Sequence, residues 1–295
     1  MRVVVAGASG LIGTALATHL RERGDEVLRL VRGPARAPEE RSWDPAAGIL
    51  DPEHLRGADA VVNLGGAGVG DRRWTASYQR VIRSSRVQGT SLLATTLAEL
   101  EDGPSVLVQG TAVGWYGDRG NAVLSEDEPT GEGFLAGVVA DWEAATRPAS
   151  LAGRRVALAR TGIVLAPRGG AFGRLLPLVR LGVGGPLGPG TQYWPWITLT
   201  DEVRALSFLL DHEISGPVNL TAPEPETCAT IVRALARRLH RPASLRVPGW
   251  ALRVGLGGFA SELLASQRAV PAVLEAQGFS FSHPTLEEGI RSVVG

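Results

Sequence analysis

The sequence contains no lysine, a single cysteine and no surplus of either charge. All 30 basic residues are therefore arginines, which can stabilise charge but cannot exchange protons near neutral pH. Cys228 has no partner for an intrachain disulfide, and a strand-like segment beginning at Arg2 leaves no room for a signal peptide, so we expect a cytoplasmic protein. The 30 acidic residues balance the arginines, which argues against nucleic-acid or anionic-membrane partners.

The chain also lacks an apolar run long enough to cross a bilayer. Its most apolar glycine-rich stretch, 249–265, contains Arg253 and Glu262 and predicts an amphipathic helix of a soluble protein. The five histidines are scattered, and none stands at metal-ligand spacing from another histidine, a cysteine or an acid. We therefore expect no metal site. Because the balanced charge disfavours nucleic acid and membranes, we expect the substrate to be a small molecule, which the sequence does not identify.

Short apolar runs alternate with longer helical patterns along the sequence. This alternation is typical of βαβ units, in which a parallel sheet is covered on both faces. A chain of 295 residues can form one large α/β domain with a smaller appendage. We predict a Rossmann-type, doubly wound parallel sheet in the α/β class. The expected strands are 3–6, 26–31, 60–64, 106–109, 156–159 and 218–220.

Composition divides the chain into two predicted domains. A large domain is expected over 1–222, and a small C-terminal domain on the substrate side over 245–293. Residues 166–197 are rich in glycine, proline and aromatics, which indicates loops that lean over a cleft. Within these loops Gln192 and Trp196 are candidate substrate contacts. The alternative is that the aromatic cluster is a buried anchor between the loops and the sheet.

The strongest motif is GASGLIG, which follows a predicted strand and opens a predicted helix. Gly7 permits a tight turn, Gly10 lets the backbone approach a pyrophosphate, and Gly13 lets the helix pack closely on the strand. The pyrophosphate would then meet N–H groups at the positive end of the helix. The motif favours a bound dinucleotide. The expected contacts are Gly7, Ser9, Gly10, Leu11, Ile12 and Gly13.

The end of the second predicted strand indicates which dinucleotide is bound. NAD proteins usually place an acid there, about 20 residues beyond the turn, to bind the ribose 2′-hydroxyl. Here Arg32 follows Val31 where the carboxylate would stand, with Arg29 and Arg36 as further candidates. A guanidinium binds a 2′-phosphate bidentately, so we predict NADP(H) over NAD. The alternative is a solvated arginine at a strand end.

Further segments carry a likeness to a known family. They are DAVVNLGGAGV (59–69), RRW (72–74), SRVQGT (85–90), GTAVGWYG (110–117), DWEAA (141–145), RTGIVL (160–165), LGVGGPLGPGTQYWPWI (181–197) and VPAVLEAQGFSF (270–281). With the glycine turn, they resemble the extended short-chain dehydrogenase/reductases, the group that contains nucleotide-sugar epimerases and dehydratases. The chain is most similar to an atypical branch called simply "epimerase family protein", which has a C-terminal domain of unknown function.

This resemblance implies further cofactor contacts. Leu64 and Gly65 would flank the adenosine and the diphosphate. Arg86 occupies the place where extended members commonly hold an asparagine near the cofactor ribose or diphosphate. Val164 would lie along the nicotinamide. The resemblance also implies a homodimer contact through two helices, for which 72–100 and 133–151 are the candidates.

The chain departs from the family at the catalytic dyad. Working members use Tyr-x-x-x-Lys on a helix, in which the ammonium lowers the pKa of the tyrosine. Counting back from Glu143 places Leu135 and Val139 at these positions, and a chain without lysine cannot hold the dyad elsewhere. Thr111 matches the family's active-site Ser/Thr and Tyr116 the tyrosine of its S-x-x-x-x-YG stretch, so these two residues are the catalytic candidates.

Two functions stay open. In the first, Thr111 or Tyr116 donates a proton to a substrate carbonyl while NADPH donates hydride, as in an oxidoreductase or epimerase-like enzyme. In the second, the protein binds NADP without turnover, as a redox sensor or an interaction partner.

Overall fold

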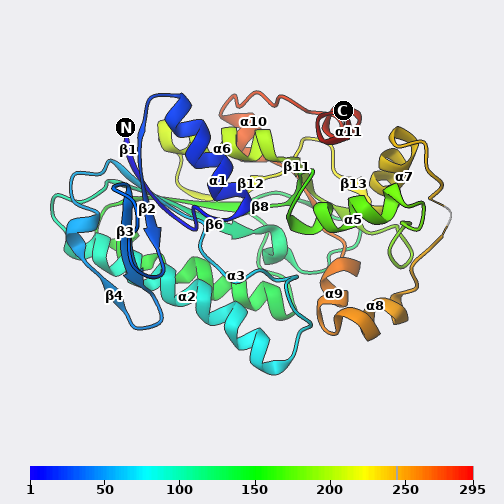
Figure 1. Cartoon of the computed structure of the whole chain (residues 1–295), viewed down its shortest axis with the longest axis horizontal. Coiled ribbons are helices and arrows are strands. Elements are labelled where there is room, and N and C mark those ends of the chain that lie inside the picture. The colour runs from blue at the N-terminus through cyan, green and yellow to red at the C-terminus, as the bar shows by residue number, and fades with distance from the viewer. Residues whose placement is uncertain (244, 295) are drawn as a thin grey trace.

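A computed structural model describes residues 1–243 and 245–294 (Figure 1). Its centre is an eight-stranded sheet whose neighbours run parallel, except for the last, antiparallel pair. The chain order reverses beside the first strand, as in doubly wound dinucleotide-binding sheets. In spatial order the strands are β12 (Gly216–Leu220), β8 (Arg155–Thr161), β6 (Val106–Ala112), β5 (Ala60–Asn63), β1 (Arg2–Ala6), β2 (Glu26–Val31), β3 (Glu40–Asp44) and β4 (Ile49–Leu50).

Helices cover both faces of this sheet, which confirms the predicted fold class. Side chains alternate along β1, so Val3 and Val5 join the core on one face and Val4 and Ala6 the core on the other. Figure 1 shows one group of helices above the sheet and a second group below it. The upper group is α1 (Leu11–Glu22), α6 (Leu199–Asp211) and α10 (Ala272–Ala276), and the lower is α2 (Ala76–Glu99) and α3 (Phe134–Ala144), with α4 (Arg147–Leu151) packed against α2.

The segment 166–197 contains more regular structure than the predicted loops. Residues Gly170–Arg180 form α5, whose buried side chains Phe172, Leu176 and Val179 recur at helical spacing. They pack with α7 (Cys228–Arg238) and α11 (Leu286–Val294) in a second core. The prediction of loops is therefore wrong for Gly170–Arg180. It followed from the frequent glycine and proline in this segment, which outweighed the helical spacing of the apolar residues. Two short strand pairs complete the region, β9 (Ile163–Leu165) with β11 (Trp196–Thr198) and β10 (Tyr193–Trp194) with β13 (Glu226–Thr227).

The C-terminal residues are joined to the large sheet region. The strand β14 (Arg268–Ala269) pairs with β7 (Val123–Leu124), and α10 packs beside β12. The division into domains at 222 and 245 stays a prediction. No helix of the described residues has the length and apolar character needed to cross a membrane. The remaining elements are the short helices η1 (Pro52–His54) and η2 (Val113–Tyr116) and the helices α8 (Gly249–Leu256) and α9 (Phe259–Leu264).

Candidate nucleotide-binding and active site

Two of the three glycines of the motif have no room for a side chain, because neighbouring backbone atoms lie too close to them. Gly7 has φ +78°, and a Cβ there would lie 2.7 Å from the carbonyl of Leu64. A Cβ on Gly13 would lie 2.3 Å from the carbonyl oxygen of Gly7. Gly10 is different, because its φ of −78° suits any residue. A Cβ at Gly10 would meet only the Gly7 oxygen, at 3.3 Å.

The N-terminus of α1 is open at Gly10. No side chain caps this helix, and Ser9 and Gly10 are exposed while Leu11 and Ile12 are half-buried. The first N–H groups of a helix have no partner within the helix, and together they favour an anion. Bare backbone without a Cβ lets a phosphate approach these groups closely. The glycine turn therefore fits the pyrophosphate of a dinucleotide.

Arg32 lies exposed just beyond the end of β2. Among the described residues, no carboxylate lies within 4 Å of it. Val31 before it is half-buried at the strand end. Arg29, which was a further candidate for the 2′-phosphate, instead pairs with Glu39 and Glu40 at 2.8 and 3.0 Å. Arg32 can therefore turn toward a phosphate, whereas Arg29 is held by acids.

The end of β5 lies against the glycine turn. The N–H of Leu64 donates to the carbonyl of Ala6, and the N–H of Gly65 donates to Oδ1 of Asn63 at 3.1 Å. Asn63 is buried, and its Nδ2 donates to Oε1 of Gln109 at 2.9 Å and to Oγ1 of Thr90 at 3.1 Å. These contacts hold the Leu64–Gly65 peptide in place beside Gly7. Sequence reasoning missed this network, although polar residues that interrupt apolar strands are a signal for it.

Arg86 of α2 is hydrogen-bonded to the loop that follows Gly65. Its Nη1 donates to the carbonyls of Ala67 and Ile82 at 2.9 and 3.0 Å, and its guanidinium lies over the ring of Trp142. Burial lowers the pKa of Arg86 to about 10. The resemblance placed this residue at the cofactor. In the structure its hydrogen bonds go to backbone carbonyls, which is the geometry of a residue that positions the loop.

Three adjacent strands bring Thr111, Arg160 and Asn219 into one row. The register pairs Arg160 of β8 with Thr111 of β6 on one side and with Asn219 of β12 on the other. Arg160 is buried and forms a two-pronged ion pair with Glu143 of α3, with both N–O distances at 2.9 Å. It also lies over the ring of Trp115, 4.1 Å from the ring centre. The guanidinium is thus surrounded by protein groups.

The hydroxyls of the two catalytic candidates, Thr111 and Tyr116, are hydrogen-bonded to other side chains of the protein. Tyr116 is fully buried, donates to Oδ1 of Asn219 at 2.8 Å and accepts from Nη1 of Arg160 at 3.1 Å. Burial raises the pKa of Tyr116. Thr111 is almost fully buried and donates to Oε1 of Glu143 at 3.1 Å. The ring of Tyr116 therefore lies in the core and lines no open surface. A catalytic role for either residue stays a prediction.

Leu135 and Val139 lie on the side of α3 that faces the turn after β6. A Cβ on Gly114 of this turn would lie 3.4 Å from Cβ of Leu135 and 3.8 Å from Cγ2 of Val139. Val139 is buried, and Leu135 is half-buried. The two positions that the dyad would occupy therefore form an apolar contact with this turn.

The two candidate substrate contacts are buried anchors. Trp196 is fully buried, and its Nε1 donates to the carbonyl of Glu224 at 3.0 Å. Gln192 is 4% exposed, and its Nε2 donates to the carbonyls of Leu187 and Leu263. The prediction that these side chains line a substrate pocket is not supported, because their polar groups hold loops together. Val164, the expected nicotinamide neighbour, pairs with Ile197 and stays partly exposed.

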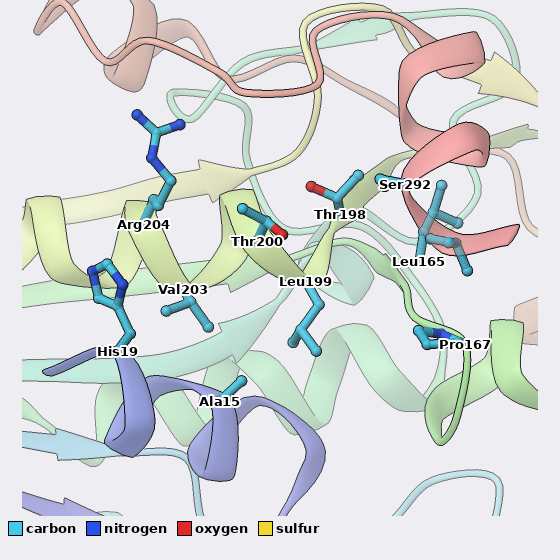
Figure 2. Close-up of a pocket in the computed structure, with 11 residues that line it drawn as sticks. Ala15, His19, Leu165, Pro167, Thr198, Leu199, Thr200, Val203, Arg204 and Ser292 are labelled. Carbon is cyan, nitrogen blue, oxygen red and sulfur yellow. The ribbon is translucent and has the colours of Figure 1, made fainter. Parts of the chain in front are cut away.

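A pocket of about 360 Å³ lies between α1 and α6 (Figure 2). Its walls come from α1, α6 and the C-terminal helix, and they include none of the predicted site residues. Figure 2 shows Leu199 and Val203 pointing toward α1, whereas the side chain of Arg204 points away from it. No group of three or more His, Cys, Asp or Glu side chains that could hold a metal occurs in residues 1–243 and 245–294.

A doubly wound sheet with an open glycine turn after its first strand is the architecture of Rossmann-type dinucleotide-binding proteins. Residues 3–221 match the NAD dependent epimerase/dehydratase family, and residues 247–293 match a domain of unknown function. The chain belongs to the NAD dependent epimerase/dehydratase family. This confirms the resemblance that the sequence motifs carried.

Individual relatives match over nearly the whole chain. An epimerase family protein of Mycobacterium bovis is 46% identical over 290 residues, which are 98% of this chain and 96% of that protein. The crystal structure of human epimerase family protein SDR39U1 with NADPH has a TM-score of 0.90 and 33% identity, covering 100% of this chain and 99% of the human one. A nucleoside-diphosphate sugar epimerase from Corynebacterium glutamicum has a TM-score of 0.82 and 36% identity, covering 100% of this chain and 58% of that chain.

Proposed function

We propose that this protein binds NADP(H) across the glycine turn and the end of β2. The observation that carries the proposal is the open N-terminus of α1 at Gly10 together with an exposed, unpaired Arg32 among the described residues. Further support comes from the human relative that was crystallised with NADPH. A bound nicotinamide dinucleotide supplies or accepts hydride.

The residues around the glycine turn and the end of β2 would hold this cofactor in distinct ways. The backbone N–H groups after Gly10 would bind the pyrophosphate, and Arg32 would bind the 2′-phosphate. The peptide of Leu64 and Gly65 would flank the adenosine, and Val164 the nicotinamide. No acid of the kind that binds a 2′-hydroxyl occupies the end of β2.

For the reaction, we propose an oxidoreductase or epimerase-like activity on a small molecule. Reduction of a carbonyl needs a proton as well as a hydride. Thr111 and Tyr116 remain the candidate donors, and each would have to exchange its present acceptor, Glu143 or Asn219, for the substrate. Loss of a tuned acid slows such chemistry by about 10²- to 10⁴-fold, so a slow enzyme is expected.

The second candidate function is NADP(H) binding without turnover, in a redox sensor or an interaction protein. It is favoured by Leu135 and Val139 at the dyad positions and by a row of polar side chains that satisfy one another. Both candidates share the same bound cofactor, and they differ in whether hydride leaves it.

One pair of assays tests this proposal. Calorimetric titration with adenosine 2′,5′-bisphosphate and with AMP, which differ only in the 2′-phosphate, tests whether this phosphate contributes affinity, and the proposal predicts tighter binding of the bisphosphate. Absorbance at 340 nm with NADPH and a panel of carbonyl compounds then separates the two candidates. Equal affinity for both nucleotides would contradict the assignment to NADP(H).

We also propose α2 and α3 as a homodimer contact. They lie next to each other below the sheet in Figure 1, and an exposed ion pair, Arg83 with Asp141 at 2.9 Å, joins them. Light scattering coupled to gel filtration tests this, because a monomer at micromolar concentration would contradict it.

A further inference from the structure

Exposed apolar side chains gather at one end of the molecule. Eleven large apolar side chains are exposed among the described residues, and six of them come from the end of α5, the loop after it, α8 and the segment before α8. These six are between 49% and 75% exposed. We call this surface the α5–α8 face. Its apolar members are Leu178, Leu181, Val183, Leu245, Trp250 and Val254.

Backbone contacts join the two halves of the α5–α8 face. A Cβ on Gly182 would lie 3.5 Å from Cγ of Pro242, and Leu187 and Val247 form a β-bridge. The loop after α5 therefore runs beside the segment that enters α8, on the right of Figure 1. Within α8, Trp250 and Val254 are one turn apart and point to the same side. The segments that carry the six side chains thus lie side by side.

Arginines surround these apolar side chains. Residues 227–261 contain six arginines and no aspartate or glutamate, although the whole chain has 30 acids among 295 residues. Among the described residues, no carboxylate lies within 4 Å of the exposed arginines on this face. On the segments of this face these arginines are Arg180, Arg241, Arg246 and Arg253, and Arg237 and Arg238 stand at the end of α7, shortly before it in the chain. A chain of zero net charge therefore carries a local excess of positive charge along residues 227–261.

We propose that the α5–α8 face docks on an anionic lipid bilayer as a peripheral contact. Tryptophan prefers the membrane–water interface, and leucine and valine gain by entering the acyl boundary. Guanidinium groups bind lipid phosphates bidentately, while their stems lie along apolar surface. The neutral net charge, which argued against a membrane partner, does not describe this local distribution.

The mixture of side chains favours a bilayer over the other partners with acidic surfaces. In α8, Arg253 stands between Trp250 and Val254, and all three are exposed. Protein interfaces usually separate an apolar centre from a polar rim, whereas here the two kinds alternate. Nucleic acid offers phosphates but little that would cover exposed leucine and valine. A headgroup layer above an acyl layer presents both chemistries at once.

Co-sedimentation of the full chain with lipid vesicles tests this proposal. Vesicles contain phosphatidylcholine alone or with about 30 mol% phosphatidylserine, at low salt and at about 0.5 M NaCl. We expect binding to the anionic vesicles only, weakened by salt. Replacing three arginines of the face together (Arg241→Gln, Arg246→Gln and Arg253→Gln) should weaken binding about a hundredfold, since each contributes about fivefold near an anionic membrane.

A second variant and a control make the test specific. Trp250→Ser with Val254→Ser removes apolar contact and should also weaken binding. The matched control is Leu151→Ser, which removes a side chain that is 75% exposed on α4, and this variant should bind as the wild type does. Thermal melts check that every variant folds.

Three results would overturn the proposal. The first is equal binding to neutral and anionic vesicles, and the second is wild-type binding by both the arginine and the Trp250 variants. The third is no binding to vesicles at low salt. Binding assays with poly-glutamate and with duplex DNA would then test whether an acidic protein or a nucleic acid occupies the face instead. Sedimentation velocity of the protein alone would test for a second copy.

Discussion

Arg160 and Glu143 hold each other through two parallel hydrogen bonds in the interior, Nε to Oε1 and Nη2 to Oε2, each 2.9 Å long. Their side chains are 3% and 7% exposed. Removing one partner leaves a buried charge, so Arg160→Met should lower the free energy of unfolding by about 3–5 kcal/mol. Removing both with Arg160→Met and Glu143→Leu should recover much of this loss. Urea unfolding of the two variants measures the difference, and equal losses would refute the coupling.

Tyr116→Phe separates a structural role of this tyrosine from a catalytic one. Loss of the hydroxyl leaves Oδ1 of Asn219 without its donor, and we expect the free energy of unfolding to fall by about 1–3 kcal/mol. Affinity for NADPH should stay within about twofold, because no cofactor contact is assigned to this buried hydroxyl. Chemical unfolding and calorimetry give the two values. Unchanged stability with a large loss of any reductase activity would instead favour Tyr116 as the proton donor.

The pair Gly10 and Gly13 separates cofactor binding from folding. A Cβ on Gly10 meets one atom at 3.3 Å and otherwise fills the space for the pyrophosphate, so Gly10→Ala should keep the melting temperature and weaken NADPH binding at least about tenfold. A Cβ on Gly13 would lie 2.3 Å from a backbone oxygen, so Gly13→Ala should lower the melting temperature. Calorimetry and thermal melts distinguish them. A Gly10 variant with normal affinity would show that the phosphate does not approach here.

Glu202 makes the stability of the protein depend on pH. Its carboxyl is fully buried, Thr161 donates to Oε1 at 2.7 Å, and Oε2 has no partner among the described residues. Burial raises the pKa of Glu202 from 4.5 to about 8. Between these values the folded protein keeps a proton that the unfolded chain has lost, so the free energy of unfolding falls as pH rises.

Glu202→Gln should remove this fall. Relative to wild type, the variant should gain roughly 3–5 kcal/mol between pH 4.5 and 8, since each pKa unit corresponds to about 1.4 kcal/mol. Urea unfolding at several pH values measures this, and the difference between the proteins cancels the contribution of shared groups. Parallel pH profiles would mean that Glu202 is ionised in the folded protein.

Local patterns in the sequence predicted the parts of the fold that depend on neighbouring residues. The strand 26–31 was predicted with its observed bounds, and the glycine turn lies between β1 and α1 as expected. β3 was missed because ERSWD buries only Trp43, so it lacks an apolar run. The helix α5 was missed because glycine and proline dominate the composition of its surroundings.

The row beneath the candidate active site depends on register between distant strands. Thr111, Arg160 and Asn219 each interrupt an apolar strand, but only the pairing of β6, β8 and β12 shows that they are neighbours. For Trp196 and Gln192 the sequence left two roles open for a related reason. Aromatic and amide side chains suit a binding pocket and a buried anchor equally well, and only their partners distinguish the two roles.

The central claim is that the surface at Gly10 and Arg32 binds NADP(H), and its most direct test is a fluorescence titration. Energy transfer from the seven tryptophans to the reduced nicotinamide follows binding of NADPH and NADH to wild type, to Arg32→Ala and to the control Arg21→Ala on the exposed side of α1. The account predicts that Arg32→Ala weakens NADPH by about 10- to 100-fold while NADH changes little and the control binds as wild type. Binding of neither dinucleotide to wild type, or equal weakening of both in Arg32→Ala, would contradict it.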